Sequence, residues 1–208
     1  MIVTFNLFMK RIIFLVLSVF NFMVLASSAD CKEPERVVRD DCHLSFLAPK
    51  RIEYIEMDGA QISGNNECYI AFRYTGNLKI KSRPNPPSTA EDWRWLTDFA
   101  LTVKGESLGD SLAQIKSTEG LEQAGMFNLV SNEHFGVPGG EVYILHYSAV
   151  KPTKDMLRLN EAEETIFAAG NNFRSASYIQ YTGVKMTKKD KEKATLYRSF
   201  FSSFGFEN

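Results

Sequence analysis

The residues of this chain that could carry chemistry are few and scattered. Asp40-Asp41-Cys42-His43 brings together the carboxylate, thiol and imidazole groups that bind zinc in proteins. The spacing matches no structural zinc motif, however, and a second ligand pair does not follow. Cys42 and His43 are neighbours on a predicted strand and would point to opposite faces, which argues against a nucleophile and base pair. The segment therefore predicts no metal, no cofactor and no catalytic residue.

The two other histidines and an acidic run lead to the same interpretation. His134 and His146 flank a predicted hairpin and would approach each other if that hairpin were tight. His146 falls inside an apolar strand, where the ring is more often a satisfied core group than a ligand. Glu161, Glu163 and Glu164 are predicted to be solvated. The motifs of serine hydrolases, zinc proteases, P-loops and dinucleotide-binding folds are absent. We therefore expect a protein that is not an enzyme.

Three cysteines indicate an oxidising compartment and one disulfide bond. Cys42 and Cys68 each stand at the start of a predicted strand, so a bond between them would close a loop across the N-terminal part of the sheet. This pair is preferred. A bond between Cys31 and Cys42 is the rival, and the sequence leaves the choice between the two open.

Residues 1–29 have the composition of a signal peptide. Lys10 and Arg11 precede the apolar stretch 12–25, which is short for a membrane span. Ser27 and Ala29 are small, which predicts cleavage between Ala29 and Asp30. Because Asp30 stands where a lipobox needs a small residue, lipidation of the next cysteine is not expected. The protein is predicted to be exported, to the periplasm of a Gram-negative bacterium or otherwise into the medium, without stable membrane insertion after cleavage.

Composition limits the class of partner. The chain has 208 residues, of which 44% are hydrophobic, enough for one domain with a true core. Two of its 24 basic residues and none of its 25 acidic residues lie in the leader, so the mature chain has a net charge of −3. Such a charge gives no electrostatic basis for binding nucleic acid. A protein is the expected partner, and the sequence does not define the oligomeric state.

The best-defined elements lie between residues 99 and 147. Phe99, Leu101 and Val103 alternate with more polar residues, which is typical of a half-buried strand. Ser107 can cap a helix whose apolar residues recur at helical spacing. Two strands, over residues 127–135 and 142–147, are joined by a turn at residues 136–140 and predict an antiparallel hairpin.

The remaining elements complete a single domain. We expect a flexible mature terminus over residues 30–41 and one α+β domain over residues 42–206, an antiparallel sheet with helices packed on it. Further strands are predicted at residues 43–48, 52–57, 69–74, 163–169 and 174–185. The final helix is capped by Thr187. It carries an apolar stripe that should be buried on the sheet, formed by Tyr197, Phe200, Phe201 and Phe204.

The order of elements from Phe99 onward resembles the PsbP-like fold, which is shared by the Mog family and by the DcrB-like exported bacterial proteins. The resemblance is carried by residues 99–103, the capped helix at 107–115, the hairpin at 136–147 and the final helix at 197–204, which ends in Ser203-Phe204. It implies an α/β/α sandwich. These families share a fold and not an activity, so the resemblance assigns no functional residue.

These observations predict an exported, non-enzymatic binding or accessory protein. An immunity protein that neutralises a secreted toxin in the periplasm is the alternative, because small exported domains without an active site suit that role. The two differ in the partner that they imply.

Overall fold

The computed structural model describes residues 35–48, 51–56, 68–76, 98–123 and 125–207. These residues belong to one compact unit. The predicted signal peptide at residues 1–29, its cleavage site at Ala29 and Asp30, and Cys31 lie outside the described residues. No helix among the described residues has the length and the apolar composition needed to cross a membrane.

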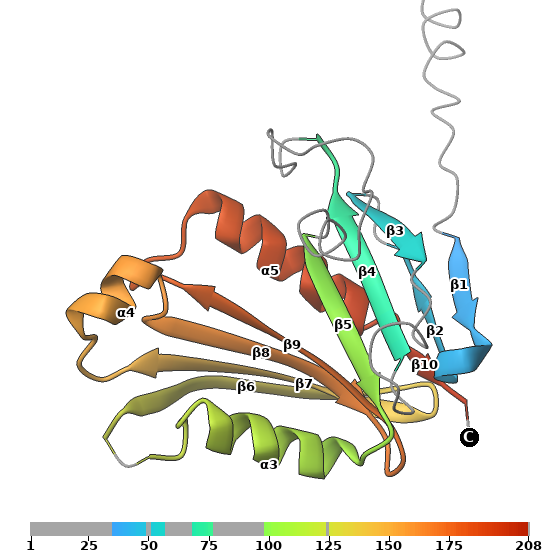
Figure 1. Ribbon diagram of the computed structural model, residues 1–208, viewed down its shortest axis with the longest axis horizontal. Coiled ribbons are helices and arrows are strands. Elements are labelled where there is room, and N and C mark those ends of the chain that lie inside the picture. Colours follow the sequence, from blue (N-terminus) through green and yellow to red (C-terminus); the bar gives the residue numbers. More distant parts are fainter. Residues whose placement is uncertain (1–34, 49–50, 57–67, 77–97, 124, 208) are drawn as a thin grey trace, which may run out of the picture. The chain divides into compact units, whose positions relative to one another are not determined.

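Seven antiparallel strands form the main sheet (Figure 1). Their order across the sheet is β3-β4-β5-β9-β8-β7-β6. The strands are β3 (Ile52–Glu56), β4 (Cys68–Tyr74), β5 (Phe99–Lys104), β6 (Phe127–Val137), β7 (Gly140–Ala149), β8 (Glu163–Gly170) and β9 (Ser175–Thr182). Each neighbouring pair is antiparallel. Together with the helices packed on it, this sheet confirms the predicted α+β class.

A second, three-stranded sheet corrects the predicted start of the domain. β1 (Arg36–Arg39) and β10 (Gly205–Phe206) pair antiparallel with β2 (Leu44–Leu47), one on each side. A 3-10 turn, η1 (Asp40–Cys42), joins β1 to β2. Residues 36–41 are therefore ordered parts of the domain, and the prediction of a flexible terminus at 30–41 is wrong for them.

Strand β1 was not predicted because the sequence around it is polar. Arg39 is buried, with 6% of its surface exposed, because its charge is matched by Asp41. Val37 packs against the core from the same short strand. Strand β10 was also missed, because Gly205 indicated only the end of a helix and two residues are too few to show a period.

Helix α3 (Leu108–Thr118) covers one face of the main sheet, over β8 and β9. Ser107 caps it as predicted, because its hydroxyl accepts a hydrogen bond from the backbone N–H of Asp110. Leu108 and Leu112 are buried from the helix side. They pack into a cluster with Leu145 of β7 and with Ile166 of β8, among other residues.

Helix α5 (Lys188–Phe201) covers the opposite face. Thr187 and Asp190 form a complete capping box, in which each side chain accepts a bond from the other's backbone N–H. The predicted stripe is buried, with exposures of 1% or less at Tyr197, Phe200, Phe201 and Phe204. Phe167 of β8 joins this second cluster, whereas its neighbours on the strand point to the α3 face. The sheet is therefore covered on both faces, as in an α/β/α sandwich.

The β6–β7 hairpin is tighter than predicted. Only Pro138 and Gly139 separate the two strands, and Gly139 has φ +70°, a conformation that favours glycine. His134 lies opposite Tyr143, and His146 lies opposite Ser131. The two histidines therefore do not meet. His146 is half-buried rather than a core residue, and its ring nitrogen lies 3.2 Å from the carboxylate of Glu163.

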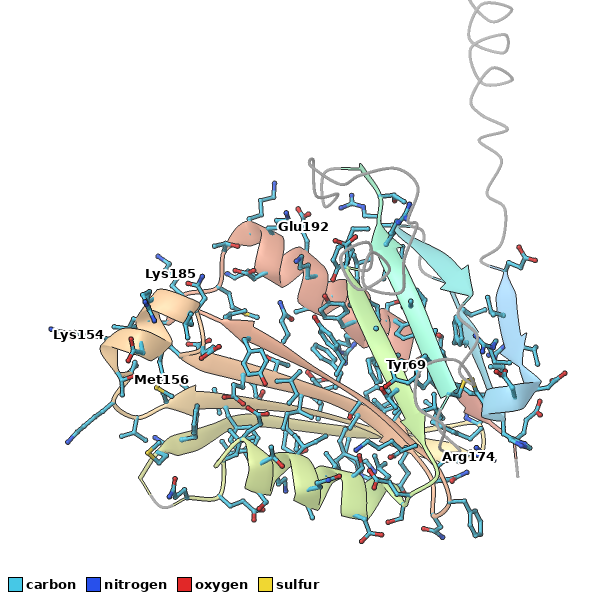
Figure 2. The ribbon with its side chains drawn as sticks, in the orientation of Figure 1. Tyr69, Lys154, Met156, Arg174, Lys185 and Glu192 are labelled. Carbon is cyan, nitrogen blue, oxygen red and sulfur yellow. A yellow bond between two sulfur atoms is a disulfide. The ribbon has the colours of Figure 1, made fainter. Side chains whose placement is uncertain are left out.

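The short helix α4 (Lys154–Leu159) was not predicted, since its residues gave only a polar segment. Thr153 caps it by accepting from the N–H of Met156. Asn160 ends it with φ 59°. None of its residues is buried, so no apolar period marks the helix in the sequence. Figure 2 shows Lys154 and Met156 at this outer end of the main sheet.

Replacing Phe200 with alanine should cost about 3–5 kcal/mol of the free energy of unfolding, because a fully buried ring leaves a cavity. Urea denaturation measures this loss. Lys189 is exposed on the same helix, and alanine there should change stability by no more than about 0.5 kcal/mol. Equal effects of the two substitutions would show that the stripe does not hold the helix on the sheet.

Candidate functional site

The predicted cysteine pair joins the two sheets. Cys42, at the end of η1, and Cys68, at the start of β4, form a disulfide with their Cα atoms 5.4 Å apart. Both residues are buried, and 26 positions separate them in sequence. The bond therefore closes a loop between the small sheet and the main sheet, as the preferred pairing expects.

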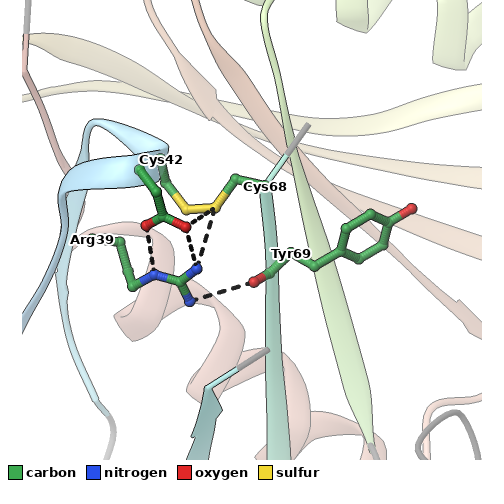
Figure 3. A network of polar contacts seen from close by, with 5 residues as sticks. Arg39, Cys42, Cys68 and Tyr69 are labelled. Carbon is green, nitrogen blue, oxygen red and sulfur yellow. Dashed lines mark hydrogen bonds and ion pairs between the residues drawn. A yellow bond between two sulfur atoms is a disulfide. The ribbon is translucent and has the colours of Figure 1, made fainter. Parts of the chain in front are cut away.

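Arg39 lies beside this bond (Figure 3) and is paired with Asp41. The guanidinium of Arg39 donates two hydrogen bonds to the carboxylate of Asp41, at 2.8 and 2.6 Å. It also lies 3.5 Å from the carbonyl oxygen of Tyr69 and 3.8 Å from the sulfur of Cys68. The hydrogen bonds from Arg39 lower the pKa of Asp41 below its ordinary value. No sequence motif indicated Arg39 as a partner.

This cluster has ligand atoms for a metal ion but uses them otherwise. A carboxylate oxygen of Asp41 and the sulfurs of Cys42 and Cys68 lie within 4.8 Å of one another. Both sulfurs belong to the disulfide, and Asp41 is already paired with Arg39. His43 is exposed with φ 48°. The arrangement is thus that of a structural clamp.

A groove lies at the start of α3. Its cavity has a volume of about 520 Å³. We call it the α3 groove. Three chain segments line it, namely the start of α3 (Ser107, Leu108, Gly109, Leu112), the start of β7 (Gly140, Glu141, Tyr143) and the β8–β9 turn (Gly170, Asn171, Asn172).

Two glycines bring these segments close together. A β-carbon added to Gly140 would clash with the carbonyl oxygen of Gly170, and one added to Gly170 would clash with that of Arg174 and lie 3.1 Å from Leu108. The sequence indicated these glycines as turn residues only. Their second effect, close backbone approach, depends on strands that are distant in sequence and cannot be seen there.

Asn171 ties the three segments to one another. Its side-chain oxygen accepts bonds from the N–H groups of Phe173 and Arg174, at 2.8 and 2.9 Å. Its amide nitrogen donates to the carbonyl of Gly139 in the β6–β7 turn, at 3.2 Å. Its own carbonyl accepts from the N–H of Leu108, at 2.9 Å. One side chain and its backbone thus fix the geometry of the groove before any ligand enters.

Glu141 and Tyr143 line one wall of the groove, and the imidazole of His134, which is not part of the lining, lies against both of them. One oxygen of Glu141 accepts from the hydroxyl of Tyr143 at 3.3 Å and lies 3.0 Å from Nε2 of His134. The rings of His134 and Tyr143 are stacked, with centroids 4.2 Å apart. Burial, and then the charge of Glu141, raise the pKa of Tyr143. The groove therefore presents a partly exposed negative charge.

The start of α3 adds little affinity for anions. The N–H of Leu108 is bonded to Asn171, and that of Asp110 is bonded to the hydroxyl of Ser107. The same hydroxyl donates to the carboxylate of Asp110 at 2.6 Å. Ser107 is therefore engaged as a helix cap. With Glu141 nearby, the groove favours a ligand that carries hydrogen-bond donors or positive charge.

Glu164 corrects the prediction of a solvated acidic run. Only 4% of its surface is exposed, and its Oε2 has no hydrogen-bond partner. Burial, and then the charges of Glu119 and Glu161, raise its pKa from about 4.5 to about 7. Tyr181, across the strand pair, has its pKa raised by burial and by the same carboxylates. The side chain faces inward because β8 is covered on both faces.

Reducing the disulfide, or replacing Cys42 and Cys68 with serine together, should remove about 2–4 kcal/mol from the free energy of unfolding. Without the bond, the unfolded chain regains the conformational entropy that the closed loop takes away. Urea denaturation measures the loss. Replacing Cys31 with serine is the matched control and should leave stability unchanged. A comparable loss with Cys31→Ser would assign the bond to a pair that includes Cys31.

The pKa of Glu164 makes stability fall as pH rises. The unfolded chain releases this proton near pH 4.5 and the folded chain near pH 7, so the protonated folded state loses its advantage between these values. Relative to Glu164→Gln, the protein should lose about 2–3 kcal/mol over this range. Denaturation at pH 4.5 and pH 8 tests this, with Glu122→Gln, an exposed acid, as control. A difference that does not depend on pH would refute it.

No family model matches the chain, and no curated protein gives a match. Among solved structures, the chain is similar to the solution structure of the cyanobacterial PsbP protein, CyanoP, from Synechocystis sp.. The two are 16% identical, the match covers 88% of this chain and 99% of that chain, and the TM-score is 0.42.

Proposed function

We propose that the chain is an exported, non-enzymatic binding or accessory protein whose α3 groove receives a basic side chain of a protein partner. The single observation that carries this proposal is the fixed groove with the carboxylate of Glu141 on its wall. Lysine or arginine would pair with that carboxylate and would lie beside the ring of Tyr143, which also lines the groove.

The construction of the groove supports binding. Asn171 and the close approach at Gly140 and Gly170 hold its three segments in place, so little ordering cost remains when a partner enters. The hydroxyl of Ser107 is bonded to Asp110, and the imidazole of His134 lies against Glu141. The hydroxyl and the imidazole each contact a carboxylate, and they are not paired with each other as a nucleophile and its base would be.

Two features support the export that the proposal includes. Residues 1–29 have the composition of a signal peptide, and the Cys42–Cys68 bond belongs in an oxidising compartment. The alternative, an immunity protein, has no specific support from the described residues. The same groove would serve that role only if the partner were a toxin.

Affinity capture from the native compartment tests the proposal with variants of the groove. Gly109→Phe should fill it without backbone strain, because a β-carbon there lies 3.8 Å from its nearest neighbour. Glu141→Gln removes the charge and keeps the shape. Capture of a partner should fall at least about tenfold with each change, because the first blocks the groove and the second removes the charge with which the partner would pair.

Ala113→Phe, on the exposed side of the same helix, adds the same ring outside the groove and should capture the partner normally. Thermal melts of all three variants must match the native protein. If Gly109→Phe captures the same proteins as Ala113→Phe, the groove is not the binding site.

A further inference from the structure

Strand β6 is the longest open sheet edge among the described residues. It stands at the end of the main sheet, where β7 pairs with one side of it and no described strand pairs with the other (Figure 1). It has 11 residues, and all residues from 128 to 134 are exposed. A bulge at Val130 interrupts the pairing with β7, so residues 131–137 form the regular part of this edge. Such an edge offers a row of free backbone N–H and C=O groups to another chain.

The other three sheet edges are protected in ways that β6 is not. Strand β3 has five residues, two of which are glutamates, β1 has four residues and carries an arginine at each end, and β10 has two residues. Short strands and charged side chains are the usual means by which proteins prevent strand addition. Strand β6 contains no lysine, arginine or proline, and its one acid is Glu133. Arg198 of α5 binds that carboxylate at 2.7 Å, so its charge is already matched.

The turn after β6 determines which of its backbone groups are free. Only two residues separate β6 from β7, so Val137 and Gly140 beside the turn exchange hydrogen bonds, and every second residue of β6 counted back from Val137 is bonded to β7 in the same way. Asn132, His134 and Gly136 alternate with these bonded residues. Their N–H and C=O groups therefore point away from β7.

The α3 groove lies one strand in from this edge. His134 of β6 contacts both Glu141 and Tyr143 of the groove wall. Of the described residues that line the groove, Glu141 alone is charged. A strand added to β6 would lie about 4.8 Å from it, and every second side chain of that strand would project on the same face as His134. A lysine or arginine at such a position can reach across the imidazole to the carboxylate of Glu141, which is 55% exposed.

We propose that β6 receives an extended segment of the protein partner by strand addition, and that this segment supplies the basic side chain that enters the α3 groove. The second half rests on the function proposed above, whereas the first half rests on the edge itself. Backbone hydrogen bonds to β6 provide affinity, and the ion pair at Glu141 fixes the register of the segment. A second copy of β6 suits the site less well, because it would bring no lysine or arginine to Glu141.

A synthetic peptide of sequence Thr-Val-Thr-Lys-Thr-Val-Thr with blocked ends is the probe. It carries a fluorophore, and the anisotropy of the fluorescence measures its binding to the purified full chain. The same peptide with glutamate in place of lysine should bind at least about tenfold more weakly. With the Glu141→Gln variant, this difference between the two peptides should disappear.

Asn132→Pro tests the strand edge, because proline removes an N–H group and is tolerated in a strand where that group faces solvent. Binding of the lysine peptide should fall at least about tenfold. Val38→Pro is the matched control on β1, an edge strand of the small sheet. The N–H of Val38 points away from β2, because the bond from the N–H of Ala48 to the carbonyl of Glu35 sets the alternation along β1. This control should bind the peptide like the native protein, and both variants should melt like it.

Hydrogen exchange of the native protein provides a test that needs no variant. With saturating lysine peptide, the amides of Asn132 and His134 should exchange at least about tenfold more slowly. The amides of Glu133 and Phe135, which are already bonded to β7, should change little. Strand addition would be overturned by no binding of the lysine peptide, by no protection at Asn132 and His134, or by equal binding to the two proline variants.

Two further outcomes separate this proposal from the function on which its second half rests. If the amides are protected but Glu141→Gln keeps the full preference for lysine, the groove is not the site of the basic side chain, and strand addition at β6 stands alone. Sedimentation without peptide examines self-association. A dimer that Asn132→Pro abolishes would assign the edge to a second copy of the chain and would overturn the proposal.

Discussion

The domain depends on aromatic packing around Phe200 of α5. Its ring lies 4.7 Å from that of Phe72 and 5.7 Å from that of Phe99, both on the main sheet, and 5.2 Å from that of Phe46 on the small sheet, all edge to face. Such pairs contribute beyond their buried area. Because one helix residue touches both sheets, the small sheet needs no extensive pairing of its own. The Cys42–Cys68 disulfide adds a covalent link between the segment of the small sheet and the main sheet.

Local signals were sufficient for most of the fold. The alternation in Phe99, Leu101 and Val103 and the helix caps at Ser107 and Thr187 each involve only a few neighbouring residues, and the structure has these elements where they were expected. Strand β1 and helix α4 escaped because their stability comes from outside. Arg39 enters the core only when Asp41 neutralises it, and α4 buries nothing. A period in hydrophobicity cannot report either case.

The candidate site shows the same division more sharply. Cys42 and Cys68 were found because cysteine is rare and its chemistry is specific. Gly170 and Asn171 were recognised as turn residues, which they are, but their contacts to Gly140 and Leu108 depend on the register of β7, β8 and β9 and on the position of α3. Glu164 was misread for a related reason. A single acid among others on a strand looks solvated until both faces of that strand are known to be covered.

The two ends of the main sheet differ in a way that follows from how each is built. At the groove end, glycines and the amide of Asn171 satisfy the backbone and draw the segments together, so the surface there is rigid and polar. At the other end, no residue of α4 is buried and Met156 packs only partly against the core, so the leucines of α4 are exposed to water. A chain under selection for solubility alone would place polar residues at Leu157, Leu159 and Val184, since nothing in the packing requires aliphatic groups there. These exposed side chains therefore add apolar surface to this end of the sheet without adding to the core.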